Sequence, residues 1–202
     1  MTPGTLSVLV LVYLVGLIIV YRQQRYLLRY LWGSFGLVAI IVIAGRIWGW
    51  YQPMGVIEAK VLTYIGTWFN FNLESLESAS LLVPTPEGWS VLNIGLECST
   101  FIESSVFTGL LLFYPRIPLL NRLLRLVTGL VAIFIINLIR LGFIIGIVAT
   151  LGGPAVPWAH AIVGRLLFFI GIVAVFWWIF TLPTLQTVRG DIGIRSTGTV
   201  RQ

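Results

Sequence analysis

The sequence has one cysteine, Cys98, and one histidine, His160, and it carries Arg140 deep inside an apolar run. A thiolate is the reactive form of cysteine. A nearby imidazole can take the thiol proton and later return a proton to a leaving amine. A guanidinium can stabilise the thiolate or the anionic oxygen of a tetrahedral intermediate. Cysteine, histidine and arginine are therefore a set of residue types suited to acyl transfer.

The cysteine lies in the stretch 93–103, where Glu97, Ser99 and Thr100 surround it and an apolar run, 101–114, follows. This run predicts a membrane helix, so we expect the thiol where water, lipid and polar side chains meet. The free N–H groups of a helix start also favour a thiolate. Because the chain has no second cysteine, an internal disulfide is excluded, and the thiol is either an inert buried group or a reactive one.

The composition indicates an integral membrane protein. Hydrophobic residues make up 58% of the 202 residues and charged residues only 10%, and the mean hydropathy is +0.98. A soluble domain carries about 25% charged residues. The net charge of +6 comes from basic residues in short tracts between apolar runs. That pattern is typical of cytoplasmic loops and does not indicate nucleic acid. We expect the lipid bilayer as the surroundings of an all-α bundle.

Five segments are apolar and long enough for a span, which requires about 20 residues. The first run has no basic segment before it and no small-residue cleavage site after it, so we expect a retained helix rather than a signal peptide. The five predicted spans are residues 4–21, 31–50, 92–114, 126–151 and 157–182.

Basic residues fix the predicted orientation. The tracts 22–29 and 115–125 and the tail 183–202 are all cytoplasmic if the chain has five spans with its N-terminus outside. We therefore predict one transmembrane helical domain, 1–182, whose segment 51–91 is extracytoplasmic, followed by a cytoplasmic polar tail.

The extracytoplasmic segment is expected to hold an amphipathic helix and a β-hairpin. Between 56 and 72, apolar residues recur at helical spacing while Glu58, Lys60 and Thr67 face elsewhere, which favours a helix lying on the outer leaflet. A sixth span is the competing interpretation, and Glu58 and Lys60 oppose it. Two apolar runs, 80–83 and 89–94, flank a turn with Pro and Gly and predict a hairpin leading into Cys98. The apolar positions of the helix are Ile57, Val61, Tyr64, Ile65 and Trp68.

Charged and polar residues inside the predicted spans gather in their outer halves. A charge inside a membrane is costly and usually marks function or a buried pair. By the five-span topology these residues line one polar cavity that opens to the outside. Arg140 is alternatively a structural partner of Glu97 or Glu103. The set comprises Cys98, Arg140 and His160, with Glu97, Glu103, Asn137, Arg46 and Arg165 as supporting residues, the last two as partners of the glutamates.

Three short motifs carry a resemblance. Glu97-Cys98-Ser99, Asn137-x-x-Arg140 and His160-x-x-x-Gly164 resemble, in this order, the motifs of the exosortase/archaeosortase family, and the length resembles its compact Gram-positive members. The resemblance covers about residues 78–182. The family commonly has glycine two residues after the cysteine, where this chain has Thr100.

The resemblance implies a membrane cysteine transpeptidase or protease. Such enzymes process exported proteins that carry a C-terminal sorting signal, which is a short motif followed by a hydrophobic helix and basic residues. Cys98 would then be the nucleophile, His160 the general acid and base, and Arg140 the anion stabiliser, with no cofactor and no metal.

Two other functions fit the same residues. The first is a non-catalytic assembly or transport subunit with a buried polar network. The second is a metal site built from Cys98, His160, Glu97 and Glu103, although no sequence-local ligand motif such as His-Glu-x-x-His is present.

The predicted topology is testable with reporter fusions. A reporter fused after Gln202 should read as cytoplasmic, and reporters inserted within 74–87 should read as external, because the basic tracts favour the inner face. A cytoplasmic signal from 74–87 would remove the basis for a shared outer cavity.

Overall fold

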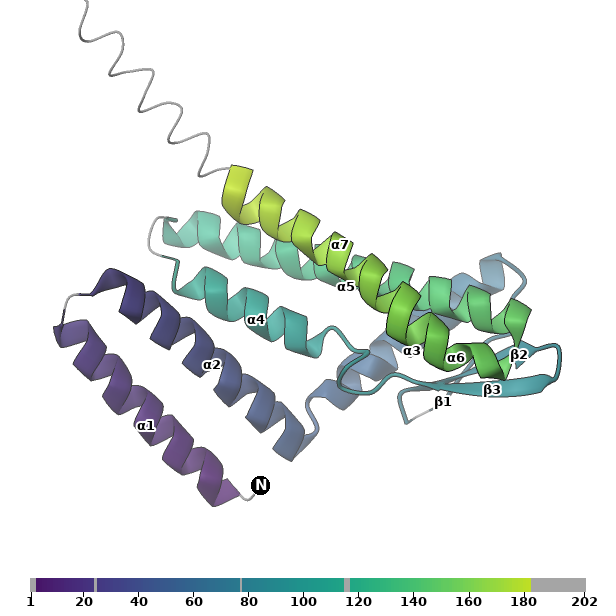
Figure 1. Ribbon diagram of the computed structural model, residues 1–202, viewed down its shortest axis with the longest axis horizontal. Helices are drawn as coiled ribbons and strands as arrows, with labels where there is room; N and C mark the ends of the chain where they lie inside the picture. Colours follow the sequence, from purple (N-terminus) through teal and green to yellow (C-terminus); the bar gives the residue numbers. More distant parts are fainter. Residues whose placement is uncertain (1–2, 24, 77, 115–116, 183–202) are drawn as a thin grey trace, which may run out of the picture.

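A computed structural model of the chain describes residues 3–23, 25–76, 78–114 and 117–182 (Figure 1). The tail predicted at 183–202 and Arg116 of the second basic tract lie outside the described residues. The described part is mainly helical with one small antiparallel sheet. Four of its helices are long and apolar enough to cross a membrane, so the chain is a multi-pass helical membrane protein by length and composition.

The first two of these four helices form a hairpin. α1 (Pro3–Arg22) and α2 (Tyr26–Trp48) lie side by side, and α2 also packs against α4 (Phe101–Leu112) (Figure 1). The Tyr13 hydroxyl donates to the Gly33 carbonyl at 3.2 Å and ties the two helices together. Both spans therefore agree with the prediction to within a few residues.

The other two long helices carry the polar residues of interest. α5 (Leu119–Leu151) has 33 residues, which is about 50 Å at 1.5 Å per residue. The last span, Gly153–Thr181, begins with a 3₁₀ turn and α6 (Val156–Trp158). It continues through a π-helical turn, Ala159–Gly164, α7 (Arg165–Phe176) and a second π-helical turn, Trp177–Thr181. α5 and α7 pack against each other.

The third predicted span, 92–114, is much shorter as a helix than expected. Its first residues belong to β3 (Gly88–Asn93) and to the turn that follows, and only Phe101–Leu112, 12 residues, is helical as α4. Leu92 and Ile94 look like span residues in the sequence because they are apolar. They are instead buried against the sheet and its neighbours, and the Ile94 N–H donates to the Ala79 carbonyl at 2.8 Å.

The helix and the hairpin predicted for the segment 51–91 are present in the structure. The hairpin pairs β2 (Ser80–Thr85) with β3 in the register Ser80↔Asn93. A third strand, β1 (Glu74–Leu76), pairs with β2 and gives the order β1-β2-β3. Three residues are too few for a periodic pattern, so sequence analysis missed this strand.

α3 (Tyr51–Trp68) is the predicted amphipathic helix, and it corrects one expectation. Ile57, Tyr64 and Trp68 of the predicted apolar stripe are exposed on the surface of the protein. Glu58, however, does not face the solvent. It is completely buried on the side that packs against the protein, together with Ala59 and Leu62. Its carboxyl is held there by hydrogen bonds that the sequence could not reveal.

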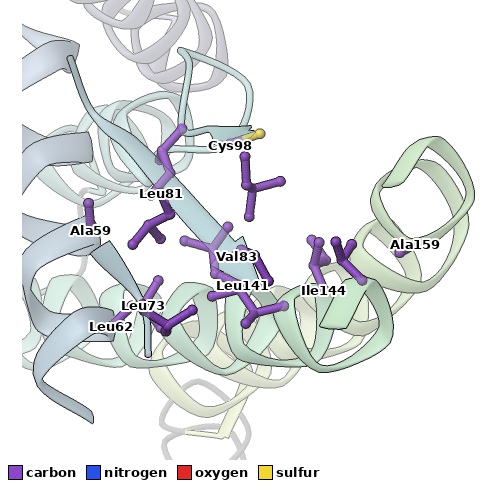
Figure 2. Packing of buried hydrophobic residues seen from close by; sticks show 13 residues of the cluster. Ala59, Leu62, Leu73, Leu81, Val83, Cys98, Leu141, Ile144 and Ala159 are labelled. Atoms are coloured by element: carbon purple, nitrogen blue, oxygen red, sulfur yellow. The ribbon is translucent and has the colours of Figure 1, made fainter. Parts of the chain in front are cut away.

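Two apolar clusters hold the fold together. One joins α4, α5 and the end of the last span around Phe107 and Ile133, both fully buried. The other joins α3, the sheet and α5 near the point where the last span begins. Figure 2 shows this second cluster with Cys98 at its margin. We call this part of the molecule the sheet end (Figure 1).

Candidate active site

Cys98 lies in a tight turn between the hairpin and α4, which we call the cysteine loop, residues 94–100. The N–H groups of Cys98 and Ser99 both donate to the Gly95 carbonyl, at 3.0 and 2.9 Å. The thiol therefore precedes α4 by three residues, whereas the sequence analysis expected it inside the membrane helix. Its exposed fraction is only 8%, so one face of a mostly buried side chain is available for chemistry.

His160 is the side chain that contacts the Cys98 thiol and can accept its proton. It lies on the π-helical turn Ala159–Gly164, and such turns occur frequently at functional sites. The Cys98 Sγ is 3.7 Å from both Nδ1 and Nε2 of the imidazole. Either ring nitrogen can therefore accept the thiol proton, depending on the tautomer. Two residues that are 62 positions apart in sequence meet at the sheet end.

Arg140 lies on α5 in the same region and is 3% exposed. Its guanidinium carbon lies 5.0 Å from the centre of the Phe168 ring, a distance that suits a cation–π contact. Its Nε has no hydrogen-bond partner. A Cβ at Gly164 would come within 3.3 Å of this Nε and within 2.8 Å of Ile144 Cδ1. The absence of a side chain at Gly164 therefore leaves the room that the guanidinium occupies.

His160 and Arg140 border a cavity of about 310 Å³, whereas Cys98 is not among the described residues that line it. One wall is apolar, and the other carries four charged side chains and the imidazole. Glu103 contributes a buried carboxylate oxygen with no hydrogen-bond partner. The described residues that line the cavity are Glu97, Glu103, Arg140, His160, Arg165, Phe168, Phe169 and Ile172.

Two predicted supporting residues have different surroundings from those expected. Arg46 is exposed near the end of α2 and is not among the described residues that line the cavity. Asn137 was expected as a supporting residue that lines the cavity. It is fully buried, and its Nδ2 donates instead to the Cys98 carbonyl at 2.9 Å. Arg46 therefore has no part in the site, whereas Asn137 holds the cysteine loop directly.

Sequence analysis missed Glu58 as a residue that contacts the cysteine loop. The Glu58 carboxyl accepts hydrogen bonds from the N–H and the hydroxyl of Thr100, at 3.1 and 2.8 Å. A glutamate within an apolar helix was a usable signal, but its helical position suggested a solvent-facing side chain. The Thr100 hydroxyl therefore has a defined partner in the structure.

Burial dominates the electrostatics of the thiol. Burial raises the pKa of Cys98 above its ordinary value. The charge of Arg140 and a hydrogen bond with the Gly95 backbone lower this pKa, but by less. The resting group at neutral pH is therefore the thiol. A base must remove its proton before it can attack, and His160 is adjacent to do so.

No family model, curated protein or solved structure matches the chain. The chemistry of the site can therefore be inferred only from the side chains that the structure places there. Within the described ranges, no group of three or more His, Cys, Asp and Glu side chains is arranged to hold a metal ion. The structure places a thiol, an imidazole and a guanidinium near one another.

The pKa of Cys98 gives a prediction for its alkylation by iodoacetamide. Only the thiolate reacts, so the rate should rise with pH and have its midpoint above the ordinary value of about 8.5. Arg140→Gln removes a charge that stabilises the thiolate, so the midpoint should move to still higher pH.

The matched control is Arg46→Gln, which removes an exposed arginine outside the cavity and should leave the pH profile unchanged. A wild-type midpoint below about 8.5 would show that burial does not dominate. Identical profiles for the wild type and Arg140→Gln would show that Arg140 does not act on the thiol.

Proposed function

We propose that this protein is a membrane-embedded cysteine protease or transpeptidase of the exosortase/archaeosortase type. The observation that carries the proposal is the 3.7 Å contact between Cys98 Sγ and the His160 ring beside the buried Arg140. The three residues come from three separate elements, and each was singled out from the sequence for its chemistry. A purely structural polar network would not require a thiol at their meeting point.

The chemistry follows from the order of the three side chains. His160 removes the thiol proton as Cys98 Sγ attacks the carbonyl carbon of the substrate, and the carbonyl oxygen becomes an oxyanion that Arg140 stabilises. Collapse of this intermediate breaks the C–N bond, and the leaving amine takes the proton from His160. The acyl group remains on Cys98 as a thioester. An incoming amine or water, deprotonated by His160, then releases the acyl group and restores the thiol.

The raised pKa of Cys98 assigns a specific role to the imidazole. Because burial keeps the thiol protonated at rest, His160 acts as a general base during attack rather than as the partner of a preformed thiolate. The charge of Arg140 lowers the cost of the thiolate as it forms. The same guanidinium then faces the developing oxyanion, for which its unpartnered Nε is an available donor.

The proposed topology brings a membrane-anchored substrate to this site. We infer five crossings, with the short α4 as the third, the N-terminus outside and the sheet end at the outer face. An exported protein with a C-terminal hydrophobic helix and basic residues would insert with its basic end inside. Its cleavage motif, just before the helix, would then lie at the depth of Cys98. The apolar wall of the cavity, Phe168, Phe169 and Ile172, suits a substrate arriving from the lipid.

The test of this function is the fate of Cys98 variants. Cys98→Ala should abolish processing of a co-expressed protein with such a tail, while its abundance in the membrane stays near that of the wild type. Cys98→Ser should be almost as inactive, because a hydroxyl is a much weaker nucleophile beside the same base. Mass analysis of the substrate's C-terminus is the measurement.

The rival function, a non-catalytic membrane subunit, is favoured by the burial of Cys98, which is typical of an inert thiol. It predicts that Cys98→Ala is harmless. Processing close to the wild-type rate in Cys98→Ala would therefore contradict the proposed enzymatic function.

Arg140→Lys separates an oxyanion role from a simple requirement for positive charge. Lysine keeps the charge but loses the planar fork of donors, and loss of one oxyanion donor typically costs about 10²–10³ in rate. Arg140→Lys should accumulate normally and keep a reactive Cys98, yet process substrate at least about tenfold more slowly, which is a floor below that range.

Arg46→Lys is the matched control, since Arg46 lies outside the cavity, and it should process substrate at the wild-type rate. Near-normal turnover by Arg140→Lys would mean that charge alone matters. The oxyanion role of Arg140 would then be wrong.

A further inference from the structure

Glu58 is a fully buried carboxyl group that the chemistry proposed above does not use. It lies on α3, outside the long apolar helices. Its Oε1 accepts two hydrogen bonds, from the N–H of Thr100 at 3.1 Å and from the Thr100 hydroxyl at 2.8 Å. Burying a carboxyl group is costly unless hydrogen bonds compensate for the lost water. Both compensating bonds go to one residue, two positions after Cys98.

The cysteine loop is anchored by three different elements. At its start, the Ile94 N–H donates to the Ala79 carbonyl at 2.8 Å, which attaches the loop to the residue preceding β2. In its middle, Asn137 from α5 donates to the Cys98 carbonyl at 2.9 Å. At its end, Glu58 from α3 accepts both bonds from Thr100. Removing the last anchor frees the loop on the side where α4 begins.

The contact between α3 and the loop is close and specific. One turn before Glu58, a Cβ at Gly55 would come within 2.8 Å of the Ile94 carbonyl oxygen, so only glycine allows the helix backbone to lie this near. One residue after Glu58, Ala59 is fully buried in the same apolar cluster as Cys98. α3 is therefore a firm support against which Glu58 can hold the loop.

We propose that Glu58 is a positioning residue for Cys98: by accepting both hydrogen bonds from Thr100, it fixes the end of the cysteine loop against α3 and so sets the approach of Sγ to His160. The catalytic consequence rests on the proposed function, whereas the effect on the thiol itself does not. The proposal also gives Thr100 a role, because its hydroxyl supplies the shorter of the two bonds.

The role of Glu58 is that of an acceptor, which an uncharged group can fill. Burial raises the pKa of the Glu58 carboxyl, while the bonds from Thr100, the Asn137 side chain and the charge of Arg140 act in the opposite direction. Its Oε2 and the Asn137 Oδ1 have no hydrogen-bond partner. A glutamine offers the same carbonyl oxygen to Thr100 and adds N–H donors for a buried acceptor.

The experiment compares paired variants in the full-length membrane protein. Glu58→Leu and Thr100→Val remove the bonds, whereas Glu58→Gln and Thr100→Ser retain them. Thr63→Val is the matched control, because the Thr63 hydroxyl on the same helix donates to the Ala59 carbonyl of its own helix. Two rates are measured: alkylation of Cys98 by iodoacetamide at one pH, and processing of a co-expressed protein with a C-terminal apolar helix, divided into kcat and KM.

If the loop is freed, the Cys98 thiol should become more accessible to the reagent but less well oriented toward His160. Glu58→Leu and Thr100→Val should therefore alkylate faster than the wild type, while kcat falls at least about tenfold with KM nearly unchanged. A misplacement of ~1 Å can cost about 10² in rate. Glu58→Gln and Thr100→Ser should recover most of both effects. A merely misfolded protein would not raise one rate, lower the other and recover with the conservative change.

Two results would overturn the proposal. Wild-type alkylation in both Glu58→Leu and Thr100→Val would show that the loop does not depend on Glu58. Failure of Glu58→Gln to recover would show that the negative charge matters rather than the acceptor. If the wild type itself processes no substrate, the proposed function fails, yet the alkylation rates still decide the role of Glu58, because they need no substrate.

Discussion

The structure depends on how a polar turn is kept among apolar helices. Polar backbone and side-chain groups that are buried away from water must find hydrogen-bond partners within the protein. The cysteine loop meets this requirement through Asn137, Glu58 and its own Gly95 turn. An unsatisfied buried donor or acceptor costs about 1–3 kcal/mol. Losing any of these partners therefore strains the loop at the residue that carries the thiol.

The same requirement explains why a sheet is present in an otherwise helical protein. The strands pair in the order β1-β2-β3 at one end of the bundle, and Leu81 and Val83 of the central strand β2 are fully buried against α5. Between β3 and α4 the chain needs only a short turn. It can therefore present Cys98 outside any helix, opposite the π-helical turn that carries His160. The late start of α4 leaves Cys98 in a loop, and the π-helical turn of the last span places His160 beside it.

Sequence reasoning reached the elements more reliably than their boundaries. Long apolar runs predicted α1, α2, α5 and the last span, because hydrophobic length is a strong signal. The turn residues near Gly88 predicted the hairpin. The third span was too long, since Leu92 and Ile94 are as apolar in a strand facing the core as in a membrane helix. Composition cannot distinguish these two environments.

The sequence likewise predicted some residues of the candidate site correctly and misjudged the surroundings of others. Cys98, Arg140 and His160 were selected by residue type and by predicted depth, and the structure brings them together at the sheet end. Glu58 was misread because its partner, Thr100, is 42 positions away, and no periodic pattern encodes such a contact. Arg46 was misread because depth alone says nothing of which side of a helix a residue occupies. Side-chain direction had to come from the packing.

The central claim is that Cys98 carries the acyl group of a substrate. The most direct measurement is the isolation of a covalent adduct, under denaturing conditions, between this protein and a co-expressed protein with a C-terminal apolar helix and basic tail. We predict a bond at Cys98 that neutral hydroxylamine cleaves, as it cleaves thioesters, and that is absent in Cys98→Ala. A substrate that is cut normally with no adduct at Cys98, or with an adduct at another residue, would contradict it.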